Sequence, residues 1–231
     1  MDAIIDLQAA GPPPEVVDVL PKLLSSEVPE GVAVLKPGAV YRVGATVVKL
    51  YRRGSRRFVR LRPPQAQRAV RSYHRLLPVR SPKPLHWDRL GHADYDSLLV
   101  YEYVEGSTLL ELWKTEASEW RAALPQFLAD LFATRVLHAD LHAGNLLWGP
   151  DGWVVLDLDG IRHGLHGLRR RTITEKTWAR LLFDFKDNDA GEILYREFHA
   201  LAKPPWGVEK SWARILGRAE ENDRIRAASG R

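Results

Sequence analysis

The chain has 231 residues, of which 45% are hydrophobic and 27% charged, and it contains no cysteine. A chain of this length can bury a hydrophobic core in one domain or in two small lobes. The lack of cysteine excludes disulfides, thiolate zinc sites, iron–sulfur ligation and thiol catalysis, and it fits a reducing compartment such as the cytoplasm. Lys and Arg number 34 against 29 for Asp and Glu, and the resulting net charge of +5 favours anionic partners.

The N-terminal sequence lacks the features of a secretion signal. Its first eight residues include two acids and no base, and Pro12, Pro13 and Pro14 follow before any long apolar run. No stretch approaches the roughly 20 apolar residues of a membrane-spanning helix, so any membrane contact would be peripheral.

The first half of the chain reads as a sheet. Residues 31–51 form three short β-branched runs separated by Pro-Gly and Gly-Ala pairs, which predicts an antiparallel meander. Residues 65–77 place apolar side chains at helical spacing and predict one amphipathic helix. Residues 84–87 and 97–103 predict two more strands. We therefore expect a five-stranded sheet with one helix in an N-terminal lobe, residues 1–104.

The second half, residues 105–231, reads as mainly helical. Thr108 and Glu111 have the spacing of a capping box, and Ser118 opens a helical pattern that runs to Phe132. Residues 146–156 contain a Gly-Pro-Asp-Gly turn between apolar runs and predict a small hairpin. Further helices are predicted near residues 175–185, 189–202 and 208–228.

The most informative segment is polar and lies between apolar runs. Residues 138–145 read HADLHAGN, and Asp157 follows twelve residues after Asn145 at the end of an apolar strand. Asp140 and Asn145 have the spacing of the H-x-D-x-x-x-x-N catalytic loop. Phosphoryl transfer needs a carboxylate to align the acceptor hydroxyl, and an Asn and an Asp to hold Mg²⁺ on the phosphates.

Two other interpretations of this segment remain open. His138, Asp140 and His142 form an H-x-D-x-H triplet that suits zinc or iron, although the oxygen-rich set with Asn145 and Asp157 suits Mg²⁺ better. Alternatively, the segment is a polar loop whose side chains only satisfy turn backbone groups.

The upstream half favours a nucleotide. Lys49 stands alone in an apolar strand, where an ammonium group is costly unless an anion neutralises it. The alternative without a functional role is a lysine that faces water from an edge strand. Glu102, Tyr103 and Val104 follow the last predicted strand, where backbone groups could bond an adenine edge.

Residues 162–171 form the densest cationic segment, RHGLHGLRRR. It is either a solvated loop or a site for an anionic substrate, and its place directly after the acidic motif favours the second interpretation. Arg169, Arg170 and Arg171 are the candidate substrate contacts.

Together these motifs resemble the protein-kinase-like superfamily and, more narrowly, the bacterial lipopolysaccharide core kinases, the Kdo and heptose kinase group. The resemblance covers about residues 31–185. It rests on four segments: Val48-Lys49, LVYEYVEG at 99–106, HADLHAGN at 138–145 and LDLD at 156–159. It implies an α+β fold of two lobes, with an N-terminal antiparallel sheet plus one helix and a mainly helical C-terminal lobe that holds the catalytic loop.

The resemblance also implies roles for individual residues. Asp140 would be the catalytic base, Asn145 and Asp157 would bind Mg²⁺, Lys49 would contact the ATP phosphates, and Glu102 to Val104 would hold the adenine. ATP and Mg²⁺ would be the cofactors. The acceptor would be an anionic glycolipid or sugar, Kdo or heptose of the lipopolysaccharide inner core, at the cytoplasmic face of the inner membrane.

The sequence departs from the family pattern in three places. The predicted helix at 65–77 contains no acid to pair with Lys49, and Gln67 is nearest the expected position. The loop at 37–44 lacks a full glycine-rich pattern, and Ala139 replaces the Arg that often precedes the catalytic Asp, so activation by phosphorylation is not expected.

Two other functions remain as alternatives: a kinase of another small molecule or of a protein, and a kinase-like nucleotide-binding module without catalysis. We expect no nucleic-acid partner, because the sequence carries no helix-turn-helix, zinc or RNA-recognition signature.

Overall fold

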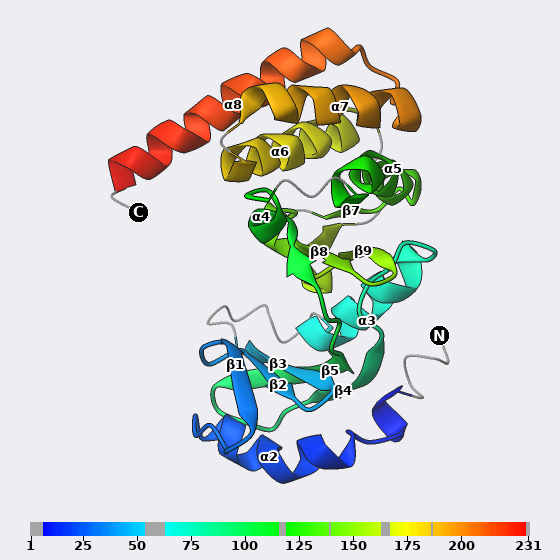
Figure 1. Ribbon diagram of the computed structural model, residues 1–231. Helices are drawn as coiled ribbons and strands as arrows, with labels where there is room; N and C mark the ends of the chain where they lie inside the picture. The colour runs from blue at the N-terminus through cyan, green and yellow to red at the C-terminus, as the bar shows by residue number, and fades with distance from the viewer. Residues whose placement is uncertain are drawn as a thin grey trace. The chain divides into compact units, whose positions relative to one another are not determined.

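The computed structural model describes residues 7–53, 63–115, 119–138, 140–162, 167–185 and 187–229. Contacts divide the chain into two compact parts. The first part is Met1–His74 with Pro82–Val104, and the second is Arg75–Ser81 with Glu105–Arg231. The first part contains a five-stranded antiparallel sheet and the second is mostly helical, which confirms the predicted α+β class (Figure 1).

The sheet of the first part contains the three predicted meander strands and the two predicted later strands. These are β1 (Val32–Lys36), β2 (Val40–Val43), β3 (Thr46–Arg52), β4 (Pro84–Arg89) and β5 (Tyr95–Glu102). Their order is β1-β2-β3-β5-β4, and every neighbouring pair is antiparallel. Gly38 and Gly44, in the two meander turns, have φ of 64° and 57°, a conformation that favours glycine.

The amphipathic helix predicted at 65–77 is α3 (Gln65–Leu76). Its apolar side chains Ala66, Ala69, Val70 and Leu76 are fully buried. The hydrophobic period therefore identified the helix and part of its buried face, whereas Leu77, which the same period placed on that face, is 55% exposed and follows the helix.

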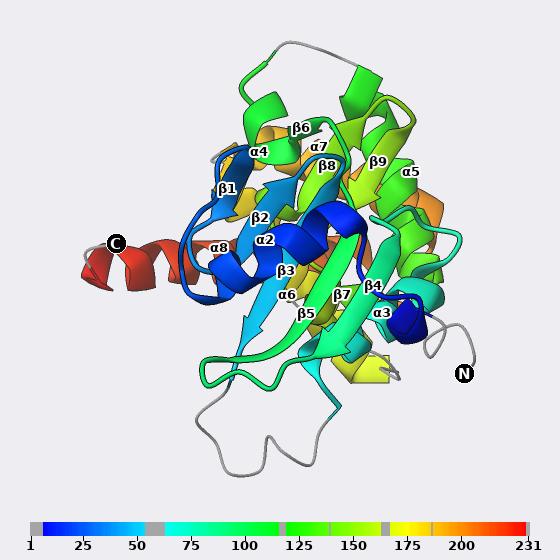
Figure 2. The ribbon, with the colours of Figure 1, turned by 90° about the horizontal axis from the view of Figure 1, so that it is seen from below.

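One helix of the first part was not predicted. Residues 14–24 form α2 (Pro14–Leu24), which runs across the sheet in Figure 2. Val16 and Leu23 are fully buried in the cluster formed with the sheet residues Val48 and Val100. The expectation of a single helix was wrong because a proline at the first helical position starts a helix and does not break it.

The second part begins with short elements. Its strands are β6 (Ser107–Thr108), β7 (Leu137–His138), β8 (Leu146–Gly149), β9 (Gly152–Val155) and β10 (Ile161–Arg162), and its first helices are α4 (Leu109–Leu112) and α5 (Glu119–Ala133). The predicted capping box is confirmed at Thr108 and Glu111, and β8–β9 is the predicted hairpin. Ser118, the predicted start of the longer helix, lies outside the described residues.

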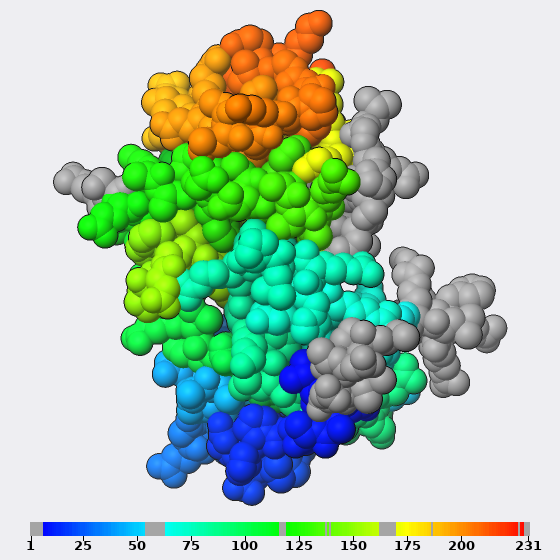
Figure 3. Space-filling model, turned by 90° about the vertical axis from the view of Figure 1, so that its right-hand side faces the viewer, coloured from blue at the N-terminus to red at the C-terminus, as the bar shows by residue number. Residues whose placement is uncertain are grey.

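Three longer helices complete the second part: α6 (Gly167–Phe185), α7 (Asn188–Ala202) and α8 (Val208–Ser229). Helix α6 packs on α8 and α7 on α5, and the space-filling view of Figure 3 shows α5 and α7 against each other. Helix α6 begins eight residues before the predicted start at Glu175. Residues 167–171 are therefore helical and not a loop, which fits the high helix propensity of arginine.

The core of the helical part is aromatic. Trp178 and Tyr195 meet edge to face with ring centroids 5.1 Å apart, and Tyr195 stacks on Trp212 at 5.6 Å. These side chains join α6, α7 and α8. None of the helices in the described ranges is long and apolar enough to cross a bilayer.

Candidate active site

The backbone holds the HADLHAGN segment against the chain that leads to Asp157. Strand β7, which ends at His138, pairs with β10, and the peptide N–H of Leu156 donates to the carbonyl of Asn145 at 2.9 Å. The N–H of Asn145 donates in turn to the carbonyl of His142 at 2.9 Å. The predicted ligand Asn145 is therefore fixed beside the residue that precedes the predicted ligand Asp157.

His138 is buried, and its ring holds this loop in place through hydrogen bonds. The residue is 2% exposed, Nε2 lies 2.9 Å from the carbonyl oxygen of Leu156, and Nδ1 accepts from the N–H of Asp140 at 3.3 Å. An acceptor at Nδ1 places the ring proton on Nε2, which donates to Leu156. Burial lowers the pKa of His138, mainly by desolvating the charged form, so the ring is held neutral.

The contacts of the histidines do not favour the zinc or iron interpretation. Both ring nitrogens of His138 have protein partners, and Nδ1 of His142 accepts from the N–H of Gly144 at 3.1 Å. Among the residues that the structure describes, no three His, Asp or Glu side chains gather as a metal-binding group. The side-chain oxygens of Asn145 and Asp157 suit a hard cation such as Mg²⁺. This ion takes few protein ligands and completes its coordination shell with phosphates and water.

Asp140, the predicted base, presents its carboxylate at the surface of the second part. The side chain is 46% exposed, and its Oδ1 lies 2.7 Å from Nη1 of Arg180 in α6. Its backbone carbonyl accepts from Nδ2 of Asn145 at 2.9 Å. Because the amide nitrogen of Asn145 is used in this bond, its carbonyl oxygen is the atom that can face a cation.

Helix α6 supplies two contacts that the sequence did not predict. Besides the ion pair of Arg180, Oδ2 of Asp184 accepts from the backbone N–H of Ala143 at 2.8 Å. Arg180 and Asp184 are four residues apart and so lie on one face of the helix. The only sequence signal was this spacing, and nothing local tied it to a loop some 40 residues upstream.

Asp157 has a left-handed backbone conformation. Its φ of 57° and ψ of 59° are uncommon for a residue other than glycine, and they turn the chain from the end of β9 into the short 3-10 turn Leu158–Gly160. The N–H of Gly160 donates to the carbonyl of Asp157 at 3.2 Å. Such strained conformations concentrate at functional sites.

Lys49 lies in the interior of the sheet of the first part. It is opposite Val40 of β2 and Leu99 of β5, and its Nζ lies 5.0 Å from the ring centroid of Tyr51. Since β3 has a neighbour on each side, the alternative of a lysine on an edge strand is wrong. The role of Lys49 in binding phosphates stays a prediction.

The predicted adenine segment continues β5. The N–H of Glu102 donates to the carbonyl of Lys83 at 3.0 Å, and the N–H of Tyr103 donates to the carbonyl of Ala45 at 2.9 Å. Adenine contact by Glu102, Tyr103 and Val104 stays a prediction, and the backbone N–H groups of Glu102 and Tyr103 are already used within the first part.

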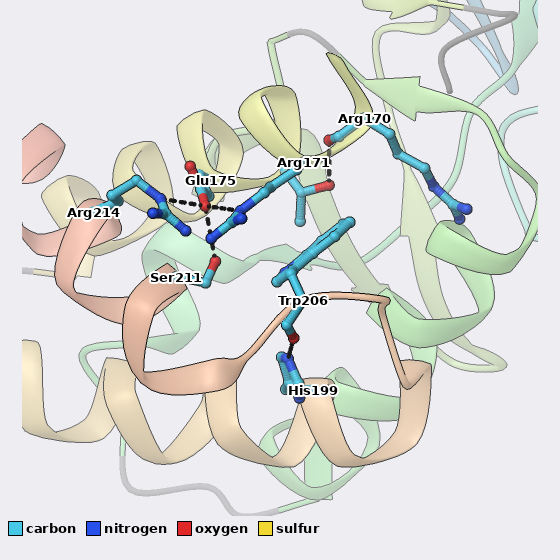
Figure 4. Close-up of polar contacts among 8 residues, drawn as sticks. Arg170, Arg171, Glu175, His199, Trp206, Ser211 and Arg214 are labelled. Carbon is cyan, nitrogen blue, oxygen red and sulfur yellow. Dashed lines mark hydrogen bonds and ion pairs between the residues drawn. The ribbon is translucent and has the colours of Figure 1, made fainter. Parts of the chain in front are cut away.

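The candidate substrate arginines begin α6. Arg170 donates to the carbonyl of Phe132, its guanidinium lies 3.7 Å from the centroid of the Phe132 ring, and burial lowers its pKa. Nε of Arg171 donates to Glu175 at 2.9 Å (Figure 4). The side chain of Arg169 and residues 163–166 lie outside the described residues. Substrate binding by this segment stays a prediction, and two of its three arginines have internal partners.

A pocket of about 850 Å³ opens elsewhere in the second part. Phe127 of α5, Trp148 of β8 and Trp153 of β9 are among its lining residues. Asp140, Asn145 and Asp157 do not line it, so the pocket is not the candidate active site.

One family model matches part of the second half of the chain. A family model described as the phosphotransferase enzyme family, APH, matches residues 109–166. This match covers about a quarter of the chain and contains Asp140, Asn145 and Asp157. A search of curated proteins found no match.

Among solved structures, the chain is similar to WbdD. The TM-score is 0.48 and the sequence identity 14%, over 78% of this chain and 43% of that chain. The chain thus spans less than half the length of that solved protein.

Proposed function

We propose that this protein is a phosphotransferase that uses ATP and Mg²⁺ to phosphorylate a hydroxyl of a lipopolysaccharide inner-core sugar, Kdo or heptose. The observation that supports it best is the anchored loop. Asp140 presents a half-exposed carboxylate, Asn145 is bonded to Leu156, the residue before Asp157, and the family match contains Asp140, Asn145 and Asp157.

The roles of the residues follow from the chemistry of phosphoryl transfer. The carboxylate of Asp140 accepts a hydrogen bond from the acceptor hydroxyl, orients its oxygen toward the γ-phosphorus and takes the proton as the new P–O bond forms. The bond from the γ-phosphorus to the bridging oxygen breaks, and ADP leaves with that oxygen. Asn145 and Asp157 would hold Mg²⁺, which neutralises phosphate charge when it is bound.

The proposed acceptor is an anionic glycolipid or sugar, and the protein would meet it in peripheral contact with the inner membrane. The net charge of +5 supports an anionic partner. The lipopolysaccharide class comes from the resemblance of the motifs alone, so the acceptor is the part of the proposal to test first.

The experiment measures ATP turnover with Mg²⁺, with and without purified inner-core acceptors. Acceptor-dependent transfer should fall by about a thousandfold in Asp140→Asn, because the base is lost while its shape is kept. ATP affinity should stay within about twofold, because Asp140 acts on the acceptor. Asp189→Asn, an exposed acid at the start of α7, is the matched control and should leave the rate unchanged.

Two results would favour the alternatives. Transfer only to other hydroxyl compounds would reject the lipopolysaccharide acceptor and retain the phosphotransferase. Tight ATP binding without turnover on any acceptor would favour a nucleotide-binding module, for which the absence of an acid from α3 is the supporting observation.

A further inference from the structure

Helix α6 contacts the catalytic loop at two points one helical turn apart. Asp184 accepts a hydrogen bond from the backbone of Ala143, and Arg180 pairs with the side chain of Asp140. The two contacts differ in what they hold. Asp184 holds the backbone of the loop, whereas Arg180 binds the carboxylate of Asp140 directly.

The ion pair constrains the orientation of the predicted base. Nη1 of Arg180 lies 2.7 Å from Oδ1 of Asp140, and the two side chains are 51% and 46% exposed. A half-exposed aspartate can otherwise populate several rotamers, since its terminal torsion is soft. An exposed ion pair adds little to folding stability, so a variant that lacks this pair is expected to fold. With Oδ1 held, Oδ2 is the oxygen left to meet an acceptor.

We propose that Arg180 is a positioning residue for Asp140: its guanidinium fixes the carboxylate so that Oδ2 faces the acceptor hydroxyl. This inference rests on the proposed function. It matters because reaction rates are sensitive to displacement, and a misplacement of about 1 Å costs on the order of a hundredfold. Arg180 acts through Asp140 and is assigned no contact with substrate.

A double-mutant cycle tests this dependence. Arg180→Met should lower kcat by about 10- to 100-fold and leave the KM for ATP within about twofold, because the misplaced base affects the chemical step. Arg180→Lys should retain more activity than Arg180→Met, because it keeps a cation but loses the planar fork. In an Asp140→Asn background, Arg180→Met should have no further effect, since there is no base left to position.

Lys176 provides the matched control. It is an exposed cation one turn earlier on α6, and Lys176→Met should leave kcat within about twofold. Equal losses from Arg180→Met in the parent and in the Asp140→Asn background would overturn the inference, as would a parent-like kcat in Arg180→Met.

A structural readout separates this inference from the proposed function. Crystal structures of the parent and of Arg180→Met should show one orientation of the Asp140 carboxylate in the parent and a different or mixed orientation in the variant. An unchanged orientation would overturn the inference whatever the activity. A parent without turnover on any acceptor would reject the proposed function, and the crystal comparison would still show whether Arg180 orients Asp140.

Discussion

Gly160 lies against the imidazole of His138. A Cβ built on Gly160 would fall 2.8 Å from Cε1 and 3.1 Å from Nδ1 of this ring. The ring cannot move away easily, because both of its nitrogens are hydrogen-bonded and it is buried. Gly160→Ala should therefore lower the free energy of unfolding by about 1–3 kcal/mol, as overpacking does, and disturb the catalytic loop. Chemical denaturation followed by circular dichroism measures the change.

Gly217 is the control for this substitution. It lies in α8 and a Cβ there would meet nothing within 4 Å. Gly217→Ala should raise the free energy of unfolding by about 0.5–1 kcal/mol, because alanine is the better helix former. If Gly160→Ala lowered the free energy of unfolding no more than Gly217→Ala does, the close packing of Gly160 against His138 would be contradicted.

The pKa of His138 makes the stability of the fold depend on pH. Burial holds this pKa below the ordinary value of 6.5. Between the two values the unfolded state binds a proton that the folded state does not, so stability is full above about pH 6.5 and falls as the pH drops toward the folded pKa. The slope from this one group is at most about 1.4 kcal/mol per pH unit.

His138→Gln removes this titration, so its free energy of unfolding should fall less steeply than that of the parent from about pH 7.5 to about pH 5.5. Urea unfolding at a series of pH values measures both slopes. His74→Gln, at an exposed position of α3, should keep the slope of the parent. Parallel curves for the parent and His138→Gln would contradict the assignment of a buried neutral ring.

The candidate site could be predicted from the sequence only where its residues share a short motif. Asp140 and Asn145 are five positions apart, and Asp157 ends a recognisable apolar strand. Arg180 and Asp184 reach the loop through tertiary packing, which no local pattern encodes. The left-handed conformation of Asp157 was equally invisible, since aspartate adopts it only occasionally and no local sequence pattern marks where it does.

At the scale of the element, α6 is joined to α8 by a buried carboxylate. Oε1 of Glu175 accepts from Nε of Arg171, from Nε of Arg214 and from the hydroxyl of Ser211, at 2.9, 2.8 and 3.1 Å (Figure 4). The side chain of Glu175 is 3% exposed, whereas those of the two arginines are 25% and 41% exposed. The two arginines therefore remain partly hydrated, whereas the buried carboxylate relies on their hydrogen bonds in place of water.

Glu175→Gln should lower the free energy of unfolding by about 2 kcal/mol, less than for a fully buried pair because the arginines reach water. Thermal and chemical unfolding measure the loss. Glu221→Gln removes an exposed partner of Arg224 in α8 and should change stability by no more than about 0.5 kcal/mol. Equal effects of the two substitutions would show that Glu175 does not join the helices.

The elements themselves were predictable where hydrophobic period and turn residues agreed. The meander, α3 and the β8–β9 hairpin all had both signals. Helix α2 was not predicted, because Pro12, Pro13 and Pro14 were considered only as evidence against a secretion signal, whereas Pro14 occupies the first helical position. The start of α6 was missed because its first two turns are cationic and lack an apolar period, while Arg170 packs on Phe132 of α5 and Arg171 pairs with Glu175, contacts that the sequence does not reveal.

At the scale of the whole molecule, charge is unevenly distributed along the chain. Between Glu30 and Asp88 there is no acidic residue and there are fourteen basic ones, which leaves 20 basic and 29 acidic residues for the rest. In this segment many of the described cations are exposed, among them Lys36, Arg42, Arg52 and Arg71. A segment with this excess of exposed positive charge attracts polyanions over a distance set by the ionic strength.

The proposed binding of ATP phosphates near Lys49, within this segment, should therefore depend on salt. Raising NaCl from about 50 to about 300 mM should weaken ATP binding severalfold, since the added ions screen the exposed cations. Calorimetric titration with ATP measures the effect, and adenosine, which carries no phosphate, is the matched ligand whose affinity should stay constant. ATP affinity that did not change with salt would mean that these cations contribute little to nucleotide binding, and the assignment of Lys49 would lose its electrostatic support.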